Sequence, residues 1–109
     1  MADLLYIMPL DFYRRSFHAQ LEWIIDQTPP EKLPAWAAAL EALIDAAETV
    51  RDAVARAGGD GKSYEVLCAV SAFNQRNSEV FRICPYSDEY EAEIGREVVL
   101  EALRARLAG

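Results

Sequence analysis

The sequence predicts a mostly α-helical fold, a small bundle of about four helices in a single acidic domain over residues 1–109. A chain of 109 residues is too short for two independent hydrophobic cores. Apolar residues make up 52% and charged residues 27%, a balance typical of a folded protein rather than a disordered one. Alanine is abundant and apolar residues recur at helical spacing, and both features favour helix.

The first predicted helix covers residues 12–27, with Asp11 as its N-cap. Its apolar face follows helical spacing and consists of Tyr13, Phe17, Leu21, Ile24 and Ile25. Residues 28–34 must end this helix, because they contain two adjacent prolines that cannot continue it. Residues 3–8 are expected to form a short strand or an apolar arm.

The second predicted helix covers residues 34–57 and has the clearest boundaries. Proline is tolerated in the first turn, where Pro34 lies, and glycine is favoured just past the end, where Gly58 and Gly59 follow. One apolar seam runs the length of the helix and occupies about 100° of its circumference. The seam consists of Trp36, Leu40, Leu43, Ala47, Val50, Val54 and Ala57.

Residues 63–84 admit two interpretations. As a helix, Ser63 caps a stripe formed by Val66, Val70 and Phe73. As an alternative, residues 63–84 contain a short β-hairpin, which would make the fold α+β. The six consecutive polar residues 74–79 argue against one unbroken helix, whereas the absence of an obvious third strand favours helix.

The last predicted helix covers residues 88–107, with Ser87 as its N-cap. Acidic residues lie near its start and arginines near its end, which complements the helix dipole. It carries two apolar strips: Ile94, Val98, Ala102 and Ala105, and Val99, Leu103 and Leu107. Two strips predict contacts from two directions, by the core and by a second subunit of a homodimer.

Two sets of four carboxylates are the most informative feature of a chain whose net charge is −7. The first carboxylate ladder is Glu41, Asp45, Glu48 and Asp52, and the second carboxylate ladder is Glu89, Glu93, Glu97 and Glu101. Helical spacing puts each set on one side of a helix. Like charges at this spacing repel one another by roughly a few tenths of a kcal/mol per pair, so the ladders do not stabilise their helices. We therefore expect both ladders to contact a partner.

The composition argues against several classes of function. An acidic chain lacks the basic face that binding to nucleic acid or to an anionic membrane requires. No apolar run approaches the length of a membrane span. The first six residues lack the features of a secretory leader, and two cysteines do not form a disulfide framework, so we expect a cytoplasmic protein.

Few residues suggest catalysis or a cofactor. Gly61-Lys62-Ser63 lacks the preceding glycine and strand of a phosphate-binding loop, so we interpret it as a turn. His18 is the only histidine, and we expect it on the surface beside Glu22 rather than in a metal site. Cys68 is expected to be buried and inert, and Cys84 to be half exposed. We expect no enzymatic activity, cofactor or metal.

These observations predict a non-catalytic interaction module that binds a basic surface on a protein partner. Carboxylates at i and i+4 lie about 6 Å apart along a helix, similar to the spacing of phosphates along a DNA strand. An acidic helix can therefore act as a nucleic-acid mimic. In size, charge and absence of motifs the chain is similar to small phage or bacterial regulators, including inhibitors, antitoxins and anti-CRISPR proteins. The alternative is a structural or oligomeric helical subunit of a larger assembly.

Overall fold

The computed structural model describes residues 6–109, and these residues form five α-helices and no strand. The helices are α1 (Phe17–Gln27), α2 (Leu33–Arg56), α3 (Tyr64–Ile83), α4 (Ser87–Ile94) and α5 (Arg96–Ala108). Two short 3-10 helices, Phe12–Arg14 and Pro30–Lys32, precede α1 and α2. The predicted mostly helical class is confirmed, with five helices rather than about four.

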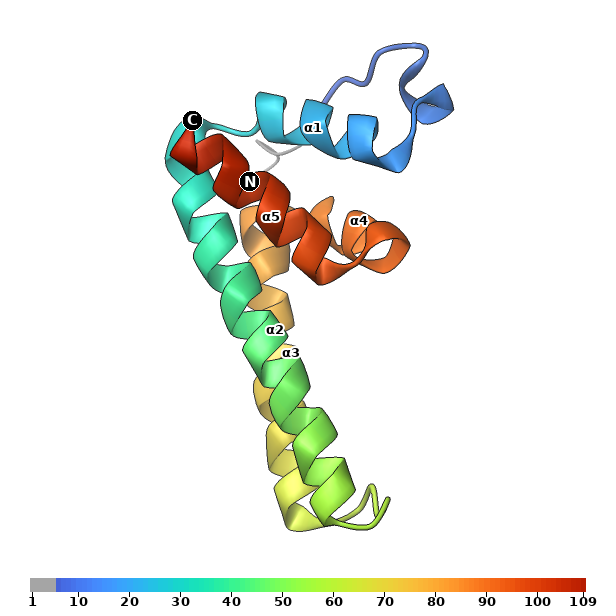
Figure 1. Ribbon diagram of the computed structural model, residues 1–109, viewed down its shortest axis with the longest axis vertical. Coiled ribbons are helices and arrows are strands. Elements are labelled where there is room, and N and C mark those ends of the chain that lie inside the picture. The colour runs from blue at the N-terminus through green and yellow to red at the C-terminus, as the bar shows by residue number, and fades with distance from the viewer. Residues whose placement is uncertain (1–5) are drawn as a thin grey trace.

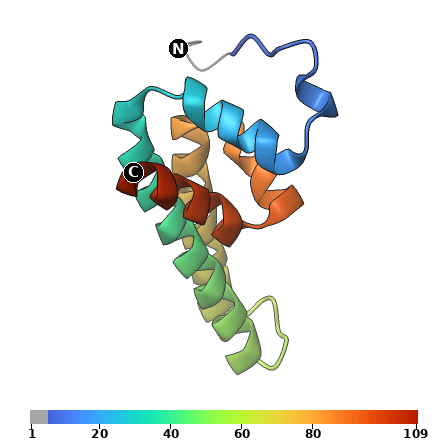
Figure 2. The ribbon, with the colours of Figure 1, turned by 45° about the horizontal axis from the view of Figure 1, so that its top comes forward.

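The molecule is elongated because α2 and α3 form a long antiparallel hairpin, and its principal extents are 48 × 28 × 27 Å (Figure 1). Helices α1, α4 and α5 pack around one end of this hairpin, and α5 crosses α2 there (Figure 2). We call this end the head. The rest of the hairpin, residues 46–72, projects from the head as a two-helix arm (Figure 1).

The main hydrophobic core lies in the head. Trp36 at its centre is fully buried, and its indole Nε1–H donates a hydrogen bond of 3.0 Å to Oγ of Ser87 at the start of α4. Apolar side chains from all five helices surround it, including Leu21, Ile24, Leu40, Leu43, Val80, Tyr90, Val99 and Leu103. Burying each large side chain contributes about 1.5–3 kcal/mol, so the head supplies most of the stability.

The arm has a separate and much smaller core. Its buried members are Ala53, Val66 and Ala69, with partly buried Val50, Val54, Ala57 and Val70 around them. Alanine and valine bury little area, and a two-helix arm covers each helix on one side only. The arm is therefore less strongly stabilised by its own contacts than the head.

The predicted second helix is confirmed by α2, with its end at the predicted glycines. Gly58 and Gly59 both have positive φ, of 63° and 88°. The N–H of Gly59 donates to the carbonyl of Val54, and the N–H of Gly58 donates to the carbonyl of Ala55, at 3.0 and 3.2 Å. This pair of bonds is the Schellman motif, which satisfies carbonyl groups at the end of a helix and favours glycine.

The hairpin alternative for residues 63–84 is wrong, because α3 is a single unbroken helix. Ser63 caps it as predicted, and its Oγ accepts the N–H of Val66 at 3.2 Å. The polar run from residue 74 to 79 does not interrupt the helix. Most of its members lie on the solvent-facing side, while Phe73 and Val80 on either side of the run pack against the head.

The first predicted helix is shorter than expected. The chain forms a 3-10 turn at Phe12–Arg14, and Ser16 then caps α1, its Oγ accepting the N–H of Ala19 at 3.1 Å. Asp11 does not cap a helix; its carboxylate instead pairs with Arg15 at 3.1 Å. Residues 6–8 form no strand, and residues 3–5 lie outside the described part of the chain.

The single helix predicted for residues 88–107 is also wrong. Gly95, with φ of 99°, separates α4 from α5. A side chain at this φ is strained, whereas glycine adopts it readily. Of the two apolar strips, Val99 and Leu103 are fully buried in the core and Leu107 is exposed, whereas Ile94, Val98 and Ala102 are half-buried and Ala105 is exposed. No helix in residues 6–109 is long and apolar enough to cross a membrane.

Candidate interaction surface

The first carboxylate ladder lies along the solvent-facing side of α2, and its four side chains are exposed. Helix α2 forms without interruption because its apolar residues pack on α3 and α5 while the opposite side carries only polar residues and alanine. Asp45, Glu48 and Asp52 span seven residues, about 10 Å along the helix axis. Asp45 lies directly before the arm of residues 46–72, and Glu48 and Asp52 lie in its first turns on α2.

Ion pairing divides the first carboxylate ladder into two parts. Glu41 pairs with Arg104 of α5, with 3.1 Å between Oε2 and the guanidinium, and so belongs to the contact between α2 and α5. In the described part of the chain, Asp45, Glu48 and Asp52 take part in no ion pair. Three carboxylates are thus left to interact with solvent or with a partner.

The second carboxylate ladder is not one line of charges. Gly95 places Glu89 and Glu93 on α4 and places Glu97 and Glu101 on α5. All four side chains are exposed. Glu89 and Glu97 lie in the first turns of their helices, where the helix dipole stabilises negative charge. The i, i+4 spacing that motivated this set therefore holds only within each pair.

A buried polar network joins α2, α4 and α5 in the head. The hydroxyl of Ser87 accepts the Trp36 indole N–H and donates to Oε2 of Glu91 at 2.6 Å. The other oxygen of Glu91 lies 3.5 Å from Nε of Arg96, whose guanidinium also stacks 5.2 Å from the centre of the Phe73 ring. Burial raises the pKa of Glu91, while the Ser87 hydrogen bond and the Arg96 charge oppose that rise.

The sequence gives little sign of this network. Glu91 resembles the other early acids of its helix, and its i, i+4 spacing from Ser87 is the one local signal. Ser87, predicted as an N-cap, instead lies inside α4 and bonds to the Glu91 and Trp36 side chains.

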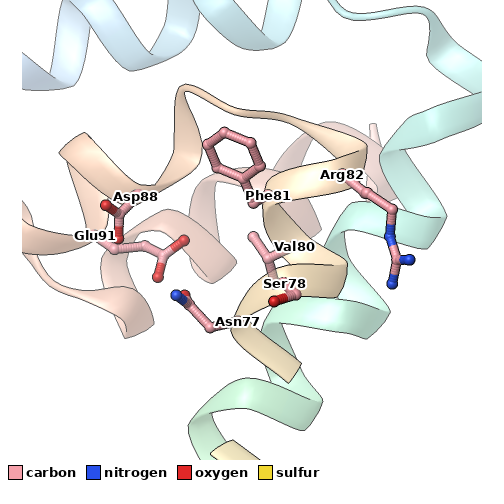
Figure 3. Close-up of a pocket in the computed structure, with 7 residues that line it drawn as sticks. All are labelled: Asn77, Ser78, Val80, Phe81, Arg82, Asp88 and Glu91. Atoms are coloured by element: carbon pink, nitrogen blue, oxygen red, sulfur yellow. The ribbon is translucent and has the colours of Figure 1, made fainter. Parts of the chain in front are cut away.

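A cavity of about 310 Å³ lies beside Glu91, between α3 and α4 (Figure 3). The side chains of Asn77 and Glu91 converge on it, while Arg82 points away (Figure 3). A buried carboxylate with a raised pKa beside a cavity is a feature of many functional sites. Here both carboxylate oxygens already face partners within the chain, Ser87 and Arg96. The arrangement therefore corresponds to a structural network that positions α5.

The other candidate residues do not assemble into a reactive site. His18 is exposed, and Glu22 pairs with Arg106 rather than with it. In residues 6–109 no group of three or more histidine, cysteine or acidic residues could hold a metal ion. Gly61-Lys62-Ser63, the segment compared with a phosphate-binding loop, forms the turn before α3, and Ser63 caps that helix.

The predicted environments of the two cysteines are reversed. Cys68 is exposed on α3, and Cys84 is fully buried, with its pKa raised by burial to about 11. A buried thiol with this pKa is protonated at neutral pH and is a poor nucleophile.

Comparisons with known proteins found no matching family model, no matching curated protein and no matching solved structure.

Proposed function

We propose that this protein acts without catalysis, by binding a basic surface of another protein through Asp45, Glu48 and Asp52 of α2. The single observation that carries the proposal is that these three exposed carboxylates lie together on one helix without an ion pair in the described chain. Paired surface acids contribute little to binding, because a partner's cation must displace an existing one. Unpaired acids are available to a partner's lysine and arginine side chains.

The geometry also supports a nucleic-acid mimic. Glu48 follows Asp45 by three residues and Asp52 follows Glu48 by four, so successive charges are about 4.5 and 6 Å apart along the helix axis. A rigid helix holds this spacing at no further cost in conformational entropy. A groove that normally binds phosphates presents several lysine and arginine side chains, and a row of carboxylates on one helix offers them an alternative row of negative charge. An inhibitor, an antitoxin or an anti-CRISPR-like regulator would act in this way.

The test is capture of partners from a lysate of the native host by the immobilised protein, compared with a charge-reversed variant. Glu48→Lys with Asp52→Lys changes the net charge by +4 while leaving Asp45 in place. Glu97→Lys with Glu101→Lys makes the same change in net charge on α5 and serves as the matched control. We expect the α2 variant to lose the captured protein and the α5 variant to retain it.

Ionic strength provides a second readout. Electrostatic association weakens as salt screens the charges, since the Debye length falls from about 10 Å at 0.1 M to about 3 Å at 1 M. We expect affinity for the captured protein to fall at least about tenfold over that range, mostly through slower association. Equal loss of capture in both charge-reversed variants would show that net charge, rather than the α2 face, determines binding. Salt-independent capture would contradict the electrostatic basis altogether.

A further inference from the structure

One face of the α2–α3 hairpin carries an open groove that the other helices leave uncovered. Two adjoining hollows, of about 630 and 310 Å³, share Ala42 and Arg76 and so form one continuous depression, here called the hairpin groove. All its lining residues belong to residues 31–49 and 69–83. Helix α5 packs on α2, but neither α1 nor α5 contributes a lining residue to the two hollows.

The floor of the hairpin groove is made almost entirely of alanine. Its members include Ala35, Ala38, Ala39, Ala42, Ala46 and Ala72. Alanine side chains allow a second helix to approach to the short end of the usual interaxial range, about 8 Å. The floor extends from Ala35 to Thr49, which is about 21 Å along α2. A depression of this length and openness fits a helix better than it fits a small molecule.

The two rims of the hairpin groove carry opposite net charges: Glu31, Lys32 and Asp45 lie on the α2 side, and Arg76, Glu79 and Arg82 lie on the α3 side. Asp45 lies on the α2 rim and Arg76 on the α3 rim, and both line the same hollow together with Ala42. Arg82 adds a second cation on the α3 side. Arg76 pairs with Glu79 at 3.2 Å, but both side chains are about half exposed, so this pair is weak and leaves donors of Arg76 available.

Because the two rims differ in the sign of their net charge, the hairpin groove is complementary in charge to the same groove of a second copy. A two-fold axis that runs along the groove, parallel to its two helices, exchanges the two rims. Asp45 of each copy then faces Arg76 of the other copy, and the pairing occurs twice because the interface is isologous. We propose that a second copy of this chain occupies the hairpin groove, forming a symmetric dimer in which the two α2–α3 hairpins pack face to face.

Size and packing agree with this occupant. Two helices, each about 10 Å wide, in contact over the floor of about 21 Å cover roughly 400 Å² per copy, about half of the 800 Å² per partner of a standard interface, which fits a dimer that dissociates on dilution. Among the apolar residues of the arm only Ala53, Val66 and Ala69 are buried, so a second hairpin would cover apolar surface that the arm leaves exposed. In the final helix, Val99 and Leu103 already pack in the core of their own chain.

The first test is the molar mass of the full chain in solution, measured by sedimentation from about 10 µM to 1 mM. We expect a dimer that dissociates on dilution. A mass that stays monomeric over the whole range would overturn the proposal.

The second test locates the interface. Ala72 is exposed on the groove floor, and Ala72→Glu places a charge there; Ala55→Glu makes the same change at an exposed position of α2 outside the groove. We expect Ala72→Glu to weaken dimerisation at least tenfold and Ala55→Glu to leave it unchanged. Far-ultraviolet circular dichroism confirms that both variants are folded. Equal masses for the two variants would place the interface elsewhere.

The third test examines the predicted pairing. Asp45→Arg and Arg76→Glu each produce two like-charge contacts in a homodimer, so each variant alone is expected to be largely monomeric. Mixed together, the two variants restore complementary charges at both contacts, and we expect a heterodimer. Failure of the mixture to associate would overturn the Asp45–Arg76 pairing.

This inference does not rest on the proposed function, but the two share Asp45. In the dimer Asp45 faces Arg76 of the second copy, and Glu48 and Asp52 are the acids left for another protein. Glu48 and Asp52 do not line the hairpin groove, so reversing them tests partner capture without altering the groove. The molar mass is measured without any other protein, and the two proposals can therefore fail separately.

Discussion

Replacing Ser87 with alanine should destabilise the protein far more than the loss of one hydroxyl usually does. Ser87 is fully buried, and its oxygen accepts the Trp36 indole N–H while its hydrogen is donated to Glu91. Ser87→Ala leaves the buried Trp36 N–H without an acceptor, at a cost of about 1–3 kcal/mol. It also removes a hydrogen bond to a carboxylate, which contributes about 1.5–3 kcal/mol.

Alanine has a higher helix propensity than serine, which offsets about 0.5 kcal/mol of this loss in stability. The expected loss is therefore about 3 kcal/mol in the free energy of unfolding, a large share of the roughly 5–15 kcal/mol of a typical domain. Urea unfolding followed by circular dichroism measures it, at one fixed protein concentration because self-association would add to the apparent stability.

Ser71→Ala is the matched control, because Ser71 is exposed on α3 and the change should stay within about 0.5 kcal/mol. A second control is the double variant Ser87→Ala with Trp36→Phe, in which the unsatisfied indole N–H no longer exists. We expect the two changes to be non-additive by about 1 kcal/mol or more. A loss below about 0.5 kcal/mol for Ser87→Ala would refute the reasoning, since it would mean that the network contributes little.

Two further predictions concern titratable groups. Burial raises the pKa of Glu91, so the folded state binds a proton that the unfolded state has released, and stability should fall as pH rises from the ordinary carboxyl pKa through that of Glu91. Urea unfolding across this range should give a flatter profile for Glu91→Gln than for the wild type, and parallel profiles would contradict the shift. Cys68 should react quickly with a disulfide reagent in the native protein, whereas Cys84 should react only on unfolding. Rapid modification of two thiols per native chain, or of one thiol in Cys68→Ser, would contradict the burial of Cys84.

Several elements could be predicted from the sequence because short-range interactions define them. Helix α2 begins after prolines that prevent α1 from continuing and ends at Gly58 and Gly59, which adopt the positive φ of a helix end. Its apolar seam repeats at helical spacing, and the same spacing fixes the solvent-facing side on which Asp45 and Glu48 lie. A few neighbouring residues suffice for each of these features.

Periodicity was less informative where the chain changes direction without an obvious signal. Apolar spacing continues on both sides of Gly95, so periodicity alone predicts one helix over 88–107. The helix breaks at Gly95, and α5 then packs on α2. This packing joins residues that are far apart in the sequence, so local spacing does not reveal it. Conversely, the polar run at 74–79 looks like a break but lies on the exposed side of an unbroken α3.

The sequence by itself determined the helical class, the limits of α2 and the exposed acidic side of that helix, because these follow from spacing, proline and glycine within a few turns. The tertiary structure alone decided which acids remain without an ion pair, since Glu41 meets Arg104 across 63 residues of chain. It also buried Glu91 against Ser87 and Trp36, and it formed the hairpin groove between α2 and α3. These features depend on contacts between residues far apart in the chain, and no local pattern specifies them.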